Sequence, residues 1–340
     1  MSLKQIAEHA GVSVMTVSAA LNGTGRVSDQ RRKEIMKIAE RLNYQPNTLA
    51  RMLKAKHKDA IGLIINERLG SVGRSGSMTE LMLQFIKFCE KHDKKYSIEF
   101  CDIDSKRDEV PDILSSGYVG GVISAGFIFE HQTRFKDWLG SHPDFPLVKF
   151  EEPYDYCVRT DFVNGVLNAM MYLKECGHTR IGLHIGPQRF GIHNLIHRGF
   201  QQGIGLLSME CRDEWIYSHD NLVRQDDRKE KMAWMKRIMR KKDRPTAMIC
   251  AGMGASRNII NFAYQLNLDV PGDLSLICTG EPWLADAIYP YVTTIERDIV
   301  KIVESAFDIL QVRMNQGKIT NGEKWINPKI VKRETVISLK

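Results

Sequence analysis

His193 and His197 lie four residues apart in the segment HNLIH, so that on a helix both could ligate one metal ion. A metal site needs further ligands, yet no Glu-x-x pattern and no nearby Cys or Asp accompanies the pair. The Gly- and Ser-rich segment 72–78 lacks the Gly-Lys-Ser/Thr ending of a phosphate loop, and no G-x-S-x-G nucleophile elbow occurs. We therefore interpret the histidines as a helix-surface pair and expect no catalytic site, metal or cofactor.

The distribution of charge indicates a different chemistry, the neutralisation of phosphates. Residues 1–58 carry eleven Lys and Arg against four Asp and Glu, a net charge of +7. The whole 340-residue chain also has a net charge of +7, so residues 59–340 are neutral in sum. A basic end on a neutral body is typical of a nucleic-acid-binding module, and the alternative is a merely solvated tail. Arg26, Arg31 and Arg32 are expected to bind backbone phosphates, which gives affinity without sequence preference.

The segment GVSVMTVSAALN, residues 11–22, has no charged side chain and is rich in small, apolar and hydroxyl residues. Such residues suit a helix that enters the major groove, because one face must pack while the other stays free of bulk. We expect Val14 and Met15 to touch thymine methyls, and Thr16 and Ser18 to bind bases or phosphates. The DNA-contacting residues expected in this segment are Ser13, Val14, Met15, Thr16, Ser18, Ala19 and Asn22.

Three helices are expected to position these side chains. Ser2 and Gln5 form a capping-box pattern for a helix through residue 10, and Gly11 follows where the chain needs a left-handed residue. Ser13 can cap a second helix over 14–21, and a third helix is expected over 28–42. Two short helices joined near Gly11 and followed by a third form a helix-turn-helix. The side chains expected to be buried are Ile6, Ala7, Ala10, Val17, Leu21, Ile35, Ile38, Ala39 and Leu42.

The segment YQPNTLARMLKAKHK, residues 44–58, predicts a fourth, short helix. Pro46 cannot continue a helix and Asn47 can cap one over 48–55, which is too short to be stable alone in water. Leu53 lies on an apolar face beside basic residues, which fits a helix that is pressed into a minor groove and unstacks a base step. A flexible basic linker is the alternative. The DNA contacts expected here are Asn47, Ala50, Arg51, Leu53 and Lys54.

The segments GVSVMTVSAALNGTGRVS and LNYQPNTLARML are similar to the DNA-binding head of the LacI/GalR family of bacterial repressors. The similarity covers the whole head without a gap. It implies a helix-turn-helix domain over 1–45 and a hinge helix over 46–58, used as a homodimer on a pseudo-palindromic operator. Leu53 falls at the position of the family's intercalating hinge leucine.

Two departures from the family pattern concern base preference. Ala19 stands where many members carry Arg in the sequence TVSR, and Val14-Met15 stands where members often have Tyr-Gln. The base preference of the family therefore does not transfer to this chain.

Beyond residue 58, short apolar runs that favour strands alternate with segments of helical period. Such alternation indicates parallel sheets covered by helices on both faces, whose ligands bind beyond the carboxyl ends of the strands. A chain of this length is also expected to form two or more domains, since single cores stop growing at about 250–300 residues. The expected strands are residues 60–65, 96–100, 120–126, 146–151, 180–186, 246–252 and 274–280.

This body resembles the family's two-lobed, periplasmic-binding-protein-like core in segments that include GHTRIGL, VPGDLSL and PYVTTI. The expected fold is thus an all-α helix-turn-helix head with a hinge helix, joined to a two-lobed α/β core at 59–340. The resemblance implies a chain that crosses between the lobes three times. It places lobe one at about 59–160 with 290–322 and lobe two at about 161–289 with 323–340.

Polar residues that the family uses to bind effectors are missing together. Ile196 stands where members usually have Arg, Gly252-Met253 replaces Asn-Asp, and Gly280 replaces an Asp, with Glu281 next to it. Either the pocket binds a different, less polar ligand in a different pose, or sugar-type induction has been lost. The effector-contact candidates near the expected strand ends are Glu151, Arg189, His193, Ile196, Met253, Glu281 and Trp283.

Three features of the whole chain favour the cytoplasm. No apolar run approaches the roughly 18 residues of a membrane span, and the start MSLKQIAEHAG has no signal-peptide core. Seven scattered cysteines without a C-x-x-C pair suit a reducing compartment.

The leading hypothesis is a transcriptional regulator, a repressor by resemblance, that binds operator DNA as a homodimer. A small-molecule effector would control it, with carbohydrate-related compounds as candidates. The alternatives are a LacI-type regulator without a sugar-type effector and a solute-binding protein of the same core fold.

Overall fold

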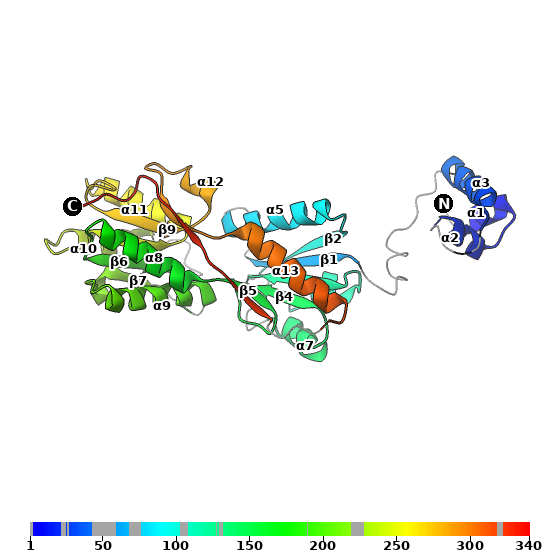
Figure 1. Cartoon of the computed structure of the whole chain (residues 1–340), viewed down its shortest axis with the longest axis horizontal. Helices are drawn as coiled ribbons and strands as arrows, with labels where there is room; N and C mark the ends of the chain where they lie inside the picture. Colours follow the sequence, from blue (N-terminus) through cyan, green and yellow to red (C-terminus); the bar gives the residue numbers. More distant parts are fainter. Residues whose placement is uncertain are drawn as a thin grey trace. The chain divides into compact units, whose positions relative to one another are not determined.

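A computed structural model describes most of the chain, which divides into two compact units, Met1–Lys58 and Asp59–Lys340. Figure 1 traces the chain from blue at the N-terminus to red at the C-terminus. The described residues are 3–21, 25, 27–42, 59–67, 76–102, 108–126, 128, 132–188, 190–218, 228–317 and 322–340.

The first unit, the head, contains the three helices that the sequence predicts: α1 (Leu3–Ala10), α2 (Val14–Leu21) and α3 (Asp29–Arg41). Their shared core is built from small and branched apolar side chains. Ala20 is buried in this core whereas Leu21 is only partly buried, because Val17 and Ala20 lie three residues apart on the inner face of α2. Ile38 and Leu42 are likewise only partly buried. The buried residues are Ile6, Ala7, Ala10, Val17, Ala20, Ile35 and Ala39.

The helix ends of the head follow the expected local chemistry. Gly11 has φ +58°, and the next amide, that of Val12, donates to the Ala7 carbonyl at 3.1 Å, which closes the C-terminus of α1. The Ser13 hydroxyl accepts from the Thr16 amide at 3.1 Å and so caps α2. The predicted caps at both ends of the turn between α1 and α2 are therefore confirmed.

Lobe one of the second unit is built on a six-stranded sheet of order β11-β5-β4-β3-β1-β2, in which all neighbours are parallel. Helices α5 and α13 cover one face, and α6 and α7 cover the other. The strands are β1 (Ile61–Glu67), β2 (Tyr96–Asp102), β3 (Gly121–Ala125), β4 (Leu147–Phe150), β5 (Cys157–Thr160) and β11 (Glu323–Ile326). The helices are α5 (Gly76–Lys91), α6 (Asp112–Ser115), α7 (Thr133–Ser141) and α13 (Ile299–Met314).

Lobe two has a second six-stranded sheet of order β12-β10-β9-β8-β6-β7, parallel except for the β10–β12 pair. Helices α8 and α9 lie side by side on one face, and α10 and α11 cover the other (Figure 1). The strands are β6 (Ile181–Ile185), β7 (Ile216–Ser218), β8 (Ala247–Ala251), β9 (Ser275–Thr279), β10 (Thr293–Glu296) and β12 (Lys329–Val331). The helices are α8 (Phe162–Glu175), α9 (Gly191–Leu206), the 3-10 helix η2 (Asp213–Trp215), α10 (Arg228–Met239), α11 (Met253–Gln265) and α12 (Pro282–Ala285).

All seven strands that the sequence predicts are confirmed, and five strands of three or four residues were not predicted. At two of these five strands the lobe boundaries differ from the expected ones. Residues 293–296, expected in lobe one, form β10 and pair with β9 of lobe two, whereas residues 323–326, expected in lobe two, form β11 and pair with β5 of lobe one. The chain therefore crosses between the lobes at residues 161, 297–298 and 327–328.

A buried histidine ties the C-terminal segment to lobe two. The His178 Nε2–H donates to the Ile337 carbonyl at 3.1 Å, and Nδ1 lies 3.0 Å from the Thr246 hydroxyl. The Leu339 amide donates to the Cys176 carbonyl beside it, at 2.7 Å. Burial lowers the pKa of His178, and the hydrogen bond to the Ile337 carbonyl opposes this shift only in part.

We expect lobe two to lose stability as the pH falls below about 6.5, because the unfolded chain then binds a proton that folded His178 excludes. One such histidine contributes at most about 1.4 kcal/mol per pH unit. Thermal unfolding of the full chain between about pH 7.5 and about pH 5 should give a flatter pH profile for His178→Gln than for the wild type. The same change at exposed His142 serves as the control, and equal slopes for His178→Gln and the wild type would rule out this linkage.

Candidate nucleic-acid interface and effector site

Helix α2 presents an apolar outer face. The side chain of Met15 is 79% exposed and that of Val14 is 44% exposed, whereas Val17 and Ala20 of the same helix are buried in the head core. Ser13 is exposed, and Thr16, Ser18 and Ala19 are half-buried around the outer face. The six members of the expected recognition set that the structure describes are thus all accessible to solvent in part.

The hydroxyl groups at the start of α2 are already engaged in the helix cap. The Ser13 and Thr16 hydroxyl oxygens lie 2.9 Å apart, and Ser13 also accepts from the Thr16 amide. Val14 and Met15 are therefore the side chains that project furthest without a polar role in the helix. Apolar groups of this kind contact the C5-methyl of thymine in the major groove.

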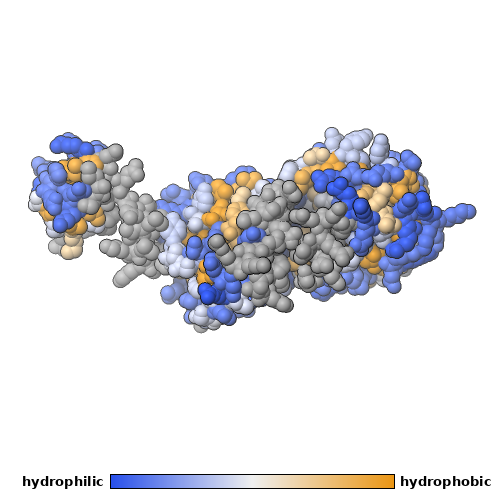
Figure 2. Space-filling view, turned by 180° about the vertical axis from the view of Figure 1, so that it is seen from behind, coloured by the Kyte–Doolittle hydropathy of each residue, from blue (hydrophilic) through white to orange (hydrophobic). Residues whose placement is uncertain are grey.

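Arg31, expected to bind phosphate, makes hydrogen bonds within the head, and its phosphate role stays a prediction. Its Nη2 donates to the Ala10 carbonyl at 2.8 Å, and its Nη1 donates to Glu34 at 2.6 Å. Because Ala10 is the last residue of α1, the guanidinium satisfies a carbonyl that the helix end leaves open and ties α3 to α1. Arg32 is half-buried, and its phosphate role stays a prediction. In Figure 2 the visible face of the head is mostly hydrophilic, with smaller hydrophobic patches.

Several expected contacts lie outside the described residues, and their roles stay predictions. These are the cap residue Ser2, the hinge segment 46–58, and the individual contacts Asn22, Arg26, Asn47, Ala50, Arg51, Leu53, Lys54 and Arg189.

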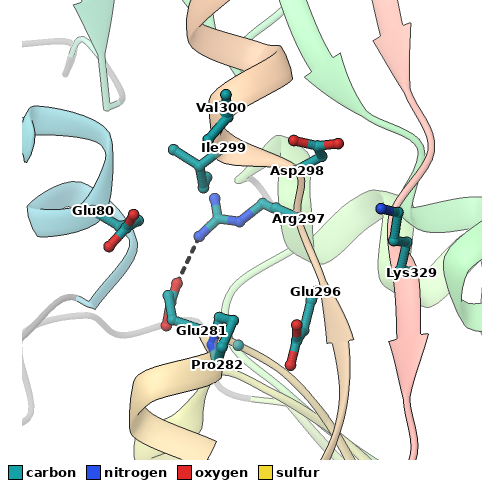
Figure 3. A pocket seen from close by; sticks show the side chains of 10 residues that line it. Glu80, Glu281, Pro282, Glu296, Arg297, Asp298, Ile299, Val300 and Lys329 are labelled. Atoms are coloured by element: carbon teal, nitrogen blue, oxygen red, sulfur yellow. Dashed lines mark hydrogen bonds and ion pairs between the residues drawn. The ribbon is translucent and has the colours of Figure 1, made fainter. Parts of the chain in front are cut away.

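In the second unit, two of the predicted effector residues, Glu151 and Glu281, meet at one arginine, Arg297. Figure 3 shows the contact between Arg297 and Glu281. Glu151 follows β4 of lobe one and Glu281 follows β9 of lobe two, and both carboxylates are almost fully buried. Arg297 lies in the second crossing segment, with its Nη2 2.9 Å from Glu281 Oε1 and its Nη1 3.7 Å from Glu151 Oε1. Sequence reasoning missed Arg297, although it is the sole Lys or Arg between residues 281 and 300.

The carboxylate of Glu151 is fixed by its own lobe. It accepts a hydrogen bond of 2.9 Å from the Thr160 amide and a second bond from the Thr160 hydroxyl at the end of β5. Its backbone has φ +63°, a left-handed conformation that costs a non-glycine residue free energy and turns the chain sharply after β4.

A hollow of about 260 Å³ opens beside Arg297. Residues of both lobes line it, including Glu80 of α5 from lobe one and Lys329 of β12 from lobe two (Figure 3). Carboxylates dominate its polar lining. The charged residues around the hollow are Glu80, Glu281, Glu296, Arg297, Asp298 and Lys329.

Glu152, the residue that follows Glu151, makes a second contact between the lobes. The amide of Gly191, the first residue of α9, donates a hydrogen bond to the Glu152 carboxylate, where a negative charge complements the positive end of the helix. Burial raises the pKa of Glu152, and nearby Lys149 and Arg159 oppose the shift. Burial also lowers the pKa of Lys149.

The other described effector candidates do not gather at Arg297. Nδ1 of His193 lies 3.4 Å from the Gly186 amide after β6, and Ile196 is fully buried in the core under α9. Met253 is buried against Gly280, and a Cβ added to Gly280 would lie 2.3 Å from the Met253 sulfur. Trp283 is half exposed on α12. Effector roles for these four residues stay predictions.

Two further classes of site can be addressed within the described residues. Of the helices that the structure describes, none combines the length and apolar character that a membrane span requires. The same part of the chain holds no group of three or more His, Cys, Asp or Glu side chains that could bind a metal ion.

Two family models match the sequence. Residues 2–47 match the bacterial regulatory proteins of the lacI family, and residues 170–336 match a periplasmic binding protein-like domain. The HTH-type transcriptional repressor PurR of Photorhabdus laumondii is 26% identical over 350 residues, which cover 99% of this chain and 97% of that protein. PurR of Serratia proteamaculans is 27% identical, with 98% of this chain and 96% of that protein covered.

Solved structures share the fold over almost the full length. The lac repressor dimer bound to operator and the anti-inducer ONPF has a TM-score of 0.82 at 19% identity, with 99% of each chain covered. The transcriptional regulator CelR in complex with cellobiose has a TM-score of 0.69 at 17% identity, with 98% of this chain and 99% of that chain covered.

We expect Arg31→Gln to destabilise the head by about 1 kcal/mol, because it removes charge-assisted bonds to Ala10 and Glu34 that are partly exposed. Hydrogen exchange of the full chain, read by mass spectrometry, should become faster across α1 and α3. Lys33→Gln is the matched control, since Lys33 is an exposed base on the same helix. Unchanged exchange together with a weaker salt dependence of DNA binding would instead identify Arg31 as a phosphate contact.

Proposed function

We propose that this chain, which belongs to the lacI family of bacterial regulatory proteins, represses transcription in the cytoplasm by binding operator DNA as a homodimer. The chain is a DNA-binding transcriptional regulator with an effector-binding type of core, and not an enzyme.

The observation that carries the proposal is the outer face of α2. Met15 and Val14 are exposed on a helix whose opposite face is buried, within a unit of 58 residues whose net charge is +7. Each head would place α2 in a major groove, where apolar side chains touch thymine methyls. With Ala19 in place of a longer polar residue, this helix would select bases by methyl contact and DNA shape.

The hinge segment would supply the second part of the interface. In the dimer, two hinge helices would lie in the central minor groove, each with Leu53 inserted at a base step. Insertion unstacks the step and bends the duplex, so its cost depends on the base sequence at the site.

The effector site would lie between the two lobes, beyond the carboxyl ends of their strands. Glu151, Glu281 and Arg297 support this location because they come from both lobes and from a crossing segment. An effector bound there would change the angle between the lobes and thereby the spacing of the two hinges. By linkage, operator DNA would change effector affinity by the same factor.

Selection of genomic fragments that bind the full-length protein tests the proposal. We expect a small set of related, pseudo-palindromic fragments. A plot of the logarithm of their binding constant against the logarithm of salt concentration should have a slope of about −5 or steeper, because several phosphates are neutralised. Binding to selected fragments that is no tighter than binding to random DNA would refute a sequence-specific regulator.

Leu53→Ala should lower affinity for the selected operator by at least about tenfold while changing affinity for random DNA little, because only the specific complex includes the unstacked step. Fluorescence anisotropy with both DNAs measures the two affinities. Lys54→Ala is the comparison variant, since loss of a phosphate contact should weaken both affinities alike. An equal loss on both DNAs for Leu53→Ala would count against the wedge.

A further inference from the structure

The bridge of Arg297 to Glu151 and Glu281 spans the two lobes. Arg297 follows β10 in the segment that carries the chain from lobe two to lobe one. Its carboxylate partners come one from each lobe, and the three side chains are at most 10% exposed. Taking charged groups this far from water costs free energy, which close pairing with an opposite charge offsets.

The bridge leaves little room for the lobes to shift while it stays intact. Glu151 is held by Thr160, and the other oxygen of Glu281 packs against Gly76, the first residue of α5 in lobe one. A Cβ on Gly76 would lie only 2.7 Å from Glu281 Oε2 and 2.6 Å from Leu284 Cδ1. The carboxylate of lobe two thus fits between the arginine and the start of a lobe-one helix.

The two carboxylates need the guanidinium between them. Without Arg297, two buried negative charges would face each other across the junction of the lobes, and their repulsion would favour a wider lobe angle. The bridge also lies at the carboxyl ends of β4 and β9, the edge where parallel α/β sheets bind their ligands. A side chain of the protein itself therefore stands where a ligand would otherwise join the lobes.

Resting on the proposed function, we propose that Arg297 is a positioning residue that holds the two lobes at the operator-binding angle, so that operator binding requires no small molecule. The chain's own ion bridge then takes the place of a co-repressor. A compound that weakens operator binding acts by separating Arg297 from one of its two carboxylates.

A second arginine provides a matched control. Arg333 is as buried as Arg297 and also pairs with two carboxylates, Asp286 and Glu296, but both partners belong to lobe two. Loss of either arginine removes two ion pairs of a buried guanidinium, yet only the loss of Arg297 removes a connection between the lobes.

The test uses full-length protein that native mass spectrometry shows to be free of small molecules, and the operator fragment from the genomic selection. We expect this wild-type protein to bind the operator specifically without any additive. Arg297→Gln should weaken operator binding at least about tenfold, a usual size for coupling between sites, with affinity for random DNA unchanged. Arg333→Gln should leave operator affinity within about twofold, since it lies outside the connection between the lobes.

Two further measurements separate positioning from folding. Small-angle scattering should show a broader distance distribution for Arg297→Gln than for Arg333→Gln, and Arg297→Lys should restore part of the operator affinity. If Arg297→Gln does not fold, Glu281→Gln tests the same bridge, and it should also weaken operator binding with affinity for random DNA unchanged.

Three results would overturn the inference. Ligand-free wild type could fail to bind an operator that it binds once a small molecule is added. Alternatively, Arg297→Gln and Arg333→Gln could affect operator binding equally, or the soluble bridge variants could bind as the wild type does. None of these three results would contradict the proposed function as a DNA-binding regulator. Failure to recover any specific fragment would overturn the proposed function and this inference together.

Discussion

Parallel strand pairing is the constraint on which this core depends. Apart from the β10–β12 pair, neighbouring strands in both sheets run in one direction, so the loops after them gather at one edge of each sheet. Glu151 and Glu281 occupy such loops in different lobes, and Arg297 reaches both from a crossing segment. The same geometry therefore fixes where charge is buried, where the lobes touch and where a ligand could act.

The head obeys a different constraint, because three short helices can bury little apolar surface. Four of its seven buried side chains are alanines, Ala7, Ala10, Ala20 and Ala39, which allow close approach of the helices but contribute little area. Capping at Gly11 and Ser13 and the bond from Arg31 to the end of α1 supply the remaining order. Helix α2, held in this way, can leave its outer apolar side chains Val14 and Met15 exposed to solvent.

Most elements could be predicted from the sequence because caps and hydrophobic periods are local signals. The three head helices and seven apolar strand segments were found in this way, whereas β10 and β11, with the sequences TTIE and EKWI, lack a continuous apolar run. Their polar content also explains the shifted lobe boundaries. The bridge at Arg297 was missed for a deeper reason, since Glu151 is 146 positions away and periodicity does not reveal which strand ends meet. The bond from Arg31 to Ala10 could not be predicted because its partner carbonyl belongs to the backbone.

The crossings also order the events of translation. Strands β11 and β12 occupy outer positions in the two sheets and come from residues 323–331, later in the chain than the other strands that the structure describes. Until a ribosome has released this stretch, β5 and β10 of the nascent chain lack these neighbours and present unpaired backbone groups that can pair with other chains. The head carries no such dependence and can fold as soon as it emerges. During synthesis the head would thus be ordered well before the core.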